Sequence, residues 1–244
     1  MTELAYMVRE DWAQEGTAME RQSARIRGWL GPQPYVVATG DLKPYGSHAS
    51  AEHEFVECLT QGSNRQIVVE FSRLKEFREA GRRLDRPLVA VHPHEVGDCH
   101  VLQDVVQANS VGKLFVIVWH GDDMVRRWLD GFDAINLDPD ATTGSAPDEL
   151  QIAAGRCWVD EQYNGLGHGN GKSAVVQLLR AFTLDGYPLD ADTWLRAFFA
   201  AGGSFGHAAD LERLIKEMQR GVRHRIEPRY RDDILEVLRE RAAQ

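Results

Sequence analysis

The chain has 244 residues, of which 43% are hydrophobic and 27% charged, and its formal net charge is -9. This length and composition allow a full hydrophobic core, in one large domain or in one domain with a smaller appendage. The negative charge disfavours a protein that coats nucleic acid with its whole surface, because phosphate groups require a basic face.

Cysteine usage and the N-terminal sequence indicate a cytoplasmic protein. Cys58, Cys99 and Cys157 are widely spaced and form no C-x-x-C pair, which predicts neither a disulfide framework nor a zinc knuckle. The opening stretch MTELAYMVREDWAQEG is charged where a secretory signal needs an apolar core. No run of about 18 apolar residues occurs, so we expect no contact with a membrane.

The first residues of the chain show a helical pattern. Leu4, Met7, Val8 and Trp12 recur at helical spacing, and Gly31-Pro32 ends the pattern. We therefore predict an N-terminal helical cap over residues 1–31.

From residue 35, short apolar runs alternate with amphipathic stretches. The predicted strands are 35–38, 67–71, 88–91, 114–119 and 134–137, and the predicted helices between them are 50–61, 73–84, 101–110 and 122–130. Strands that are apolar on both faces and alternate with helices indicate a mostly parallel sheet with helices on both faces. We predict a Rossmann-like α/β domain over 32–140.

The remainder of the chain has a different character. The stretch LDPDATTGSAPDEL is rich in proline, glycine, serine and aspartate and is typical of a linker. Further helices are predicted at 172–183, 190–201, 208–220 and 230–242. We expect a helical C-terminal region over 150–244.

Polar residues follow the predicted strands. Ligands bind to open parallel sheets at the carboxyl ends of the strands, where loops converge and helix N-termini present free N–H groups. The stretch VHPHEVGDCH, which follows the third predicted strand, is rich in histidine, and five of the nine histidines fall at this edge. The polar residues expected here include Asp41, His48, Glu70, His92, His94, His120, Asp122 and Asp123.

These residue types predict acid–base or metal chemistry. Imidazole titrates near neutrality and is the commonest metal ligand. In an extended segment the side chains of His92 and His94 point the same way, so both can reach one ion. We predict His92, His94, His120, Asp122 and Asp123 as catalytic residues, with His92, His94 and Asp122 as ligands of Mg²⁺ or Zn²⁺. Alternatively, Asp122 and Asp123 only cap a helix, and the histidines are solvated loop residues.

The order of the acids resembles that of Toprim-type magnesium-dependent nucleic-acid enzymes. Glu70 ends one predicted strand, and Asp122-Asp123 follow a later one. The paired acids of that family are separated by one residue, whereas here they are adjacent. The resemblance implies a magnesium-dependent phosphodiester reaction as one alternative.

Two basic features predict anion binding. The stretch GLGHGNGKS has the Walker A glycine one position out of register, so no nucleotide triphosphatase is predicted, but Lys172 at a helix start can still hold an anion. Basic residues also outnumber acidic ones over 213–231. The predicted substrate- or phosphate-binding residues are Asp41, His48, Lys172, Arg220, Arg223 and Arg225. Alternatively, the basic residues pair with the chain's own acids or with a second copy of the chain in a homo-oligomer.

Absent motifs narrow the function. No G-x-G-x-x-G follows the first strand of the 32–140 domain, and no G-x-S-x-G follows a predicted strand; this disfavours NAD, FAD and ATP as cofactors and an α/β-hydrolase reaction. We expect an enzyme that hydrolyses a phosphate- or nucleotide-containing substrate at the sheet edge, with or without a divalent metal. The alternatives are a non-catalytic ligand-binding or regulatory protein, or a nucleic-acid-binding or processing protein that uses the basic C-terminal helices.

Overall fold

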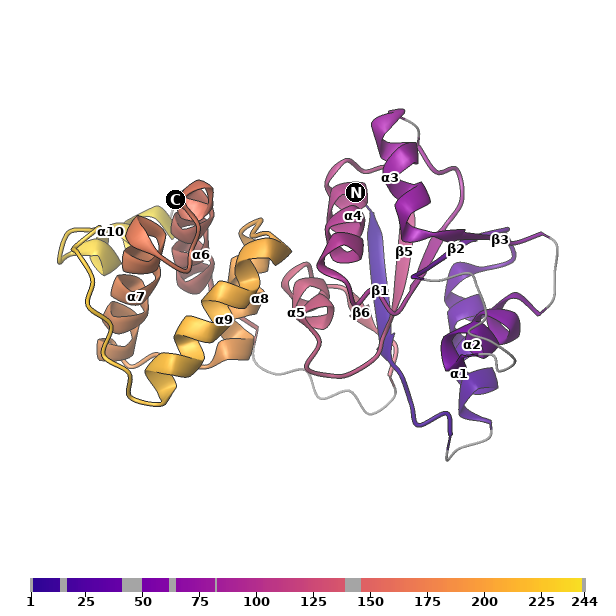
Figure 1. Ribbon diagram of the computed structural model, residues 1–244, viewed down its shortest axis with the longest axis horizontal. Helices are drawn as coiled ribbons and strands as arrows, with labels where there is room; N and C mark the ends of the chain where they lie inside the picture. The colour runs from indigo at the N-terminus through magenta and orange to yellow at the C-terminus, as the bar shows by residue number, and fades with distance from the viewer. Residues whose placement is uncertain are drawn as a thin grey trace. The chain divides into compact units, whose positions relative to one another are not determined.

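The computed structural model describes residues 2–13, 17–40, 50–61, 65–81, 83–138 and 146–242, with only the backbone of Arg78. The chain forms two compact units (Figure 1). Unit 1 comprises Met1–Leu129 and Asp133–Ala141, and unit 2 comprises Asp130–Phe132 and Thr142–Gln244.

Unit 1 is built on a parallel sheet. Within the described residues its strands are β1 (Glu3–Val8), β2 (Val36–Thr39), β3 (Ile67–Glu70), β4 (Leu88–Val91), β5 (Lys113–Val118) and β6 (Ile135–Asn136). The strand order is β3-β2-β4-β5-β1-β6, and every pair of neighbouring strands is parallel. The predicted Rossmann-like α/β fold is therefore confirmed.

The helices of unit 1 cover both faces of the sheet (Figure 1). The helices α1 (Ala18–Leu30) and α2 (Ala51–Thr60) lie on one face, and α3 (Phe71–Glu79), α4 (Val96–Gln107) and α5 (Met124–Gly131) lie on the other. The connection after β2 therefore leaves toward one edge of the sheet, and the connection after β4 leaves toward the other edge. Because β2 and β4 are neighbours, a topological switch point, the kind of place where open α/β sheets bind ligands, lies at their carboxyl ends.

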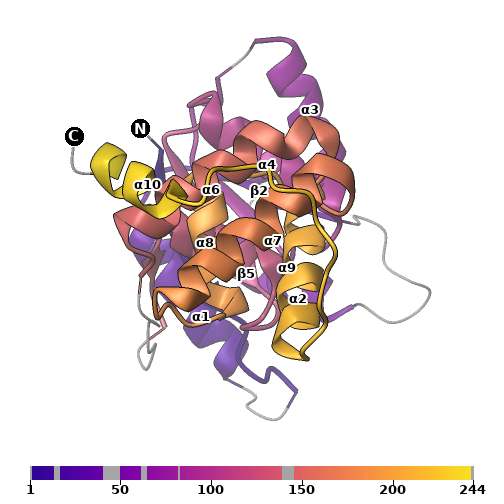
Figure 2. The same cartoon turned by 90° about the vertical axis from the view of Figure 1, so that its left-hand side faces the viewer.

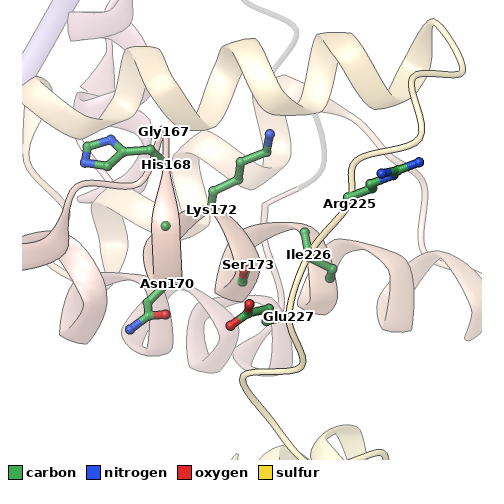
Figure 3. A pocket seen from close by; sticks show the side chains of 9 residues that line it. Gly167, His168, Asn170, Lys172, Ser173, Arg225, Ile226 and Glu227 are labelled. Atoms are coloured by element: carbon green, nitrogen blue, oxygen red, sulfur yellow. The ribbon is translucent and has the colours of Figure 1, made fainter.

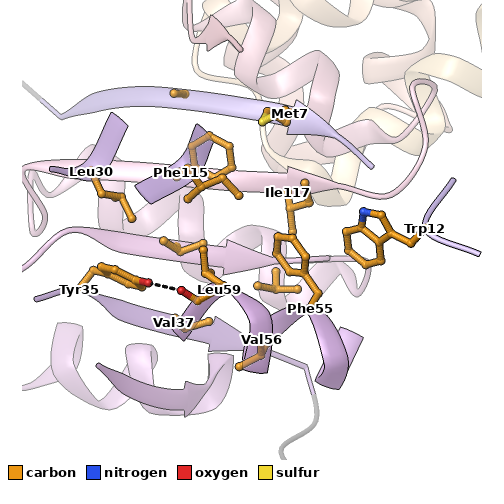
Figure 4. Packing of buried hydrophobic residues seen from close by; sticks show 14 of the residues in the cluster. Met7, Trp12, Leu30, Tyr35, Val37, Phe55, Val56, Leu59, Phe115 and Ile117 are labelled. Atoms are coloured by element: carbon orange, nitrogen blue, oxygen red, sulfur yellow. Dashed lines mark hydrogen bonds between the residues drawn. The ribbon is translucent and has the colours of Figure 1, made fainter. Parts of the chain in front are cut away.

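A hydrophobic cluster fixes α1 and α2 to the sheet (Figure 4). Alternate strand residues point into this cluster because side chains in a strand alternate between the two faces. Within it, the ring of Trp12 stacks on Phe55 of α2, with 4.5 Å between centroids. The Tyr35 hydroxyl donates a hydrogen bond of 2.6 Å to the carbonyl of Leu59, near the C-terminus of α2. The helix is therefore held at its middle and near its C-terminus.

The predicted helix at the start of the chain is wrong over Glu3–Val8, which form β1. The spacing of Leu4, Met7 and Val8 fits a helix, but Leu4 to Val8 is also an unbroken apolar run. Leu4 through Met7 are all buried, as expected for a strand enclosed on both faces. The strand lies between β5 and β6. The helical prediction holds only for α1.

Two other helices differ from the sequence prediction, one near the site and one in unit 2. Helix α4 begins at Val96 and not at residue 101, so Asp98, Cys99 and His100 lie in a helix and not in a loop. A helix that the sequence did not predict, α6 (Glu149–Glu161), follows Asp148, whose side chain and Gln151 form a capping box.

Unit 2 is helical. In addition to α6 it contains a short 3₁₀ helix (Gln162–Asn164) and the helices α7 (Gly169–Leu184), α8 (Ala191–Ala200), α9 (Phe205–Gln219) and α10 (Ile234–Ala242). Helix α6 packs on α7, α8 and α10, and α9 packs on α7 and α8 (Figure 2). The fully buried aromatic side chains are Trp158, Phe182, Trp194, Phe198 and Phe199. Among the described helices, none has both the length and the apolar composition that crossing a bilayer requires.

Close packing of α6 on α8 predicts a stability effect at Gly155. A Cβ at this position would lie 2.6 Å from the backbone oxygen of Ala197 and 3.0 Å from the Ala201 Cβ. We expect Gly155→Ala to lower the free energy of unfolding by about 1–3 kcal/mol through overpacking, measured by urea denaturation. In the control, Gly28→Ala, the new methyl group meets nothing within 4 Å, so the higher helix propensity of alanine should stabilise the protein. Equal effects of the two substitutions would contradict the packing described here.

Candidate functional site

The carboxyl ends of β2, β4 and β5 lie at one level of the sheet. Thr39 is paired with Val91, and Val91 with Ile117. The backbone N–H of His92 donates to the carbonyl of Ile117 at 3.1 Å. The predicted convergence of the turns after β4 and β5 is therefore confirmed.

Glu52 lies at the centre of this edge. Its helix, α2, begins after Ser50, whose side chain caps the N–H of His53, so Glu52 lies in the first turn. One Glu52 oxygen, Oε1, accepts hydrogen bonds from the Thr39 hydroxyl and from the N–H of Gly40. The other oxygen, Oε2, lies 3.8 Å from Nδ1 of His92, and the Glu52 side chain is only 19% exposed. The carboxylate therefore joins the end of β2 to the residue after β4.

The surroundings of Glu52 favour its charged form. Burial alone raises the pKa of Glu52, but the His92 imidazole, the Thr39 hydroxyl and the Gly40 N–H together bring the pKa below its ordinary value. Glu52 is therefore ionised at neutral pH, with its charge facing Nδ1 of His92.

The lowered pKa of Glu52 predicts a pH-dependent stability effect. A depressed pKa stabilises the fold above the pKa of the unfolded state, about 4.3, and this contribution disappears as the pH falls through the folded-state value. Glu52→Gln should therefore lower the free energy of unfolding at pH 7, and the difference from the wild-type protein should shrink at acidic pH. Urea denaturation at both pH values checks this expectation. Glu95→Gln, at an exposed neighbouring carboxylate, is the control, and a Glu52→Gln deficit that grew on acidification would contradict the assignment.

The backbone and ring of His92 are tightly held. His92 has a φ of 50°, which is uncommon for a residue other than glycine. Its ring lies between Trp119, with centroids 4.1 Å apart, and His94, with centroids 4.6 Å apart. Backbone strain of this kind persists only where the surroundings fix it, and it occurs often at functional sites. We call these three rings the His92 stack.

The position of Glu52 favours one tautomer of His92. A carboxylate facing Nδ1 favours the tautomer that carries its proton there, which leaves Nε2 as the acceptor. Among the described residues, no partner of His92 Nε2 is found. This nitrogen can therefore accept a proton from a bound water or substrate.

The start of α4 adds an acid and a buried thiol. Burial raises the pKa of Asp98; His94 opposes this shift, and Glu95 and Glu52 add to it. Burial and nearby carboxylates raise the pKa of Cys99 to about 12. The thiol is therefore protonated at neutral pH and donates to the carbonyl of Pro93 at 3.3 Å, so it is a structural group.

The predicted residues after β5 are placed differently. The carboxylate of Asp123 accepts from the N–H groups of Trp119 and His120, at 3.2 and 2.9 Å, and so closes the turn. The acid therefore has a local structural role, but these bonds close the turn before α5, whereas the alternative interpretation expected a helix cap. His120 and Asp122 are exposed. The residues that the structure describes contain no group of three or more His, Cys, Asp or Glu side chains placed to hold a metal ion, so His92, His94 and Asp122 are not brought together as ligands.

The sheet order also separates the acids of the Toprim-like pattern. Glu70 ends β3 at the edge of the sheet, and β2 and β4 lie between β3 and β5. At about 4.8 Å per strand, the ends of β3 and β5 are roughly 14 Å apart. The strand order therefore does not bring the strand ends that precede Glu70 and Asp122 next to each other. The carboxylate of Glu70 instead accepts from the hydroxyl of Ser72 at 3.3 Å.

The remaining predicted residues do not form one cluster. Asp41 and His48 lie outside the described residues. Lys172 and Arg225 line one pocket of unit 2, whereas Arg223 lines a second, more apolar pocket beside Leu184. The Nε–H of Arg220 donates to the carbonyl of Lys216.

Several other basic residues of this region pair with acids of the same chain. Arg213 lies 3.0 Å from Asp210, Lys216 lies 2.9 Å from Glu212, and Arg229 lies 2.8 Å from Glu161. For these residues, the alternative of pairing within the chain is confirmed. They therefore add little to an anion-binding surface.

Sequence reasoning missed Glu52, Thr39 and Trp119. An acid in the first turn of a helix has an ordinary explanation in the helix dipole, so Glu52 carried no distinct signal. Comparisons of the chain with protein-family models, curated proteins and solved structures found no match. A functional assignment therefore rests on the geometry of the site and not on any relative.

Proposed function

We propose that the protein is a hydrolase in which His92 acts as a general base and Glu52 orients it, at the switch point between β2 and β4. The observation that carries this proposal is the largely buried carboxylate of Glu52 facing Nδ1 of His92. The arrangement corresponds to the carboxylate–imidazole pair of acid–base catalysis. The separation of 3.8 Å is longer than a hydrogen bond, and such contacts often tighten when substrate binds.

The pair supports a simple proton-transfer sequence. Nε2 of His92 takes a proton from water as the water oxygen forms a bond to the phosphorus atom of the substrate. The bond from phosphorus to the leaving group breaks on the side opposite the attacking water, so the leaving oxygen takes a proton from solvent and the imidazolium later releases its proton to solvent. Glu52, which stays ionised, stabilises the imidazolium between these steps.

The acidic side chains near Glu52 and His92 determine what a phosphate substrate needs in order to bind there. The side chains of Glu95 and His94 are more than half exposed, and Asp98 lies near both. A phosphate placed beside these acids requires a compensating cation. Mg²⁺ is commonly held by one or two carboxylates together with substrate phosphates. Glu95 and Asp98 could supply such carboxylates, and the ion would neutralise phosphate charge.

A panel of substrates tests the reaction class. The full chain is incubated with p-nitrophenyl phosphate, bis(p-nitrophenyl) phosphate, and nucleoside mono-, di- and triphosphates. Each is tested with added Mg²⁺ or Zn²⁺ and with a chelator, and product release is measured. We expect hydrolysis of at least one compound, with loss of turnover in Glu52→Gln. Ligand binding without turnover would instead favour the alternative of a non-catalytic binding or regulatory protein.

The His92 stack predicts a contribution of His94 to substrate binding. His94 is the outer ring of the stack, and its side chain is 52% exposed. A planar group such as a nucleobase can stack on the exposed ring, at about 1–3 kcal/mol per base. We expect His94→Ala to raise KM for a nucleotide substrate at least fivefold and to change kcat less, measured by steady-state kinetics. His120→Ala, at another exposed histidine of this edge, should leave KM unchanged.

A further inference from the structure

A pocket of about 550 Å³ lies at the N-terminus of α7 in unit 2 (Figure 3). It is lined by the glycine-rich start of the helix and by Arg225, Ile226 and Glu227 of a later segment. Figure 3 shows Lys172 extending from the first turn of α7, with that segment running past it. The volume is in the range of small-molecule sites, about 300–1,000 Å³.

Ser173 points to a ligand in this pocket. The residue lines the pocket and is only 8% exposed. Within the described part of the chain, its hydroxyl has no hydrogen-bond partner. The hydroxyl oxygen is not among the fully enclosed, unpartnered side-chain atoms of the described residues, so it can be reached from the pocket. An acceptor oxygen of a ligand would satisfy the hydroxyl.

The charges around the pocket favour an anion. Neither Lys172 nor Arg225 has an ion-pair partner among the described residues, in contrast to Arg213 and Arg229. The N-cap residue of α7, His168, makes no side-chain capping hydrogen bond. The free N–H groups of the first turn, together with the helix dipole, therefore add to the attraction for a phosphate group.

Glu227 restricts the class of ligand. Its carboxylate lines the same pocket as the two cations. A carboxylate repels free phosphate, but it accepts hydrogen bonds from hydroxyl groups. The lining therefore has donors for a phosphate and an acceptor for a hydroxyl, which are the two parts of a sugar phosphate.

We propose that this pocket binds a small phosphate ester that carries hydroxyl groups, with the phosphate on Lys172, Ser173 and the first turn of α7. Glu227 accepts a hydrogen bond from the hydroxyl-bearing part, and Arg225 adds positive charge. This site belongs to unit 2 and is independent of the reaction proposed for Glu52 and His92. Its test is a binding measurement, so its outcome is separate from the outcome of the hydrolysis assay.

Isothermal titration of the full chain with ribose 5-phosphate, ribose and inorganic phosphate tests the proposal. We expect ribose 5-phosphate to bind more tightly than inorganic phosphate, and ribose not to bind. Lys172→Ala and Ser173→Ala should each raise the Kd for ribose 5-phosphate at least about tenfold, because each removes a hydrogen bond to a charged group. Glu227→Gln should weaken the binding of ribose 5-phosphate more than that of phosphate.

Arg223→Ala is the matched control. Arg223 is exposed and belongs to the same segment as Arg225, but it lines the other pocket. Its substitution should leave the Kd unchanged. No binding of ribose 5-phosphate at millimolar concentration, or equal affinity for inorganic phosphate, would overturn the proposal. So would an Arg223→Ala effect as large as that of Lys172→Ala.

Discussion

Replacement of His92 by asparagine is expected to lower kcat by about 10²–10⁴-fold, the range that a general base contributes. Asparagine is the informative substitution because the backbone of His92 has a φ of 50°, and asparagine tolerates this conformation better than most residues. The fold should therefore persist while Nε2 is lost. The measurement is kcat on the substrate that the panel identifies, together with the thermal unfolding temperature.

A control at the same edge of the sheet separates the loss of the proposed base from the loss of any nearby imidazole. His120 is exposed and lies after β5, so His120→Asn removes an imidazole from this edge without touching Glu52. It should leave kcat within about twofold of the wild-type value, because surface substitutions away from a site have small effects. If both variants lost activity equally, or if His92→Asn kept it, the role of His92 as the base would be wrong.

The sequence predicted most of the sheet because its strands are short apolar runs between amphipathic helices. β2, β3, β4 and β5 fall within one or two residues of their predicted ranges. β1 was missed because five consecutive apolar residues satisfy the helical and the extended periods equally well. The choice between them depends on the partners β5 and β6, which are more than a hundred residues away in the chain.

The candidate site was predicted in part for a related reason. His92 and His94 directly follow the buried strand β4, so the direction of the chain places them at the carboxyl edge of the sheet. Glu52 follows a stretch that carries no strand or site signal, and it reaches His92 only because β2 and β4 are neighbours. Strand order depends on how the crossovers pack, which hydrophobic periodicity does not determine.

The packing that positions Glu52 predicts the largest stability effect. Phe55 is fully buried, and its ring stacks on Trp12 with an interplanar angle of 11°. It lies three residues after Glu52, on a neighbouring position of the same helix. We expect Phe55→Ala to lower the free energy of unfolding by about 3–5 kcal/mol, the usual cost of removing a buried phenylalanine side chain.

Urea denaturation of Phe55→Ala and of a matched variant, Phe77→Ala, measures this effect. Phe77 belongs to α3 and is 38% exposed, so its loss should change stability by no more than about 0.5 kcal/mol. At a urea concentration where Phe55→Ala stays folded, its kcat should also fall, because α2 loses an anchor and Glu52 moves relative to His92. If Phe55→Ala were destabilised but retained full kcat, the position of Glu52 would not depend on this contact. The pairing of Glu52 with His92 would then have to be maintained by Thr39 and Gly40 alone.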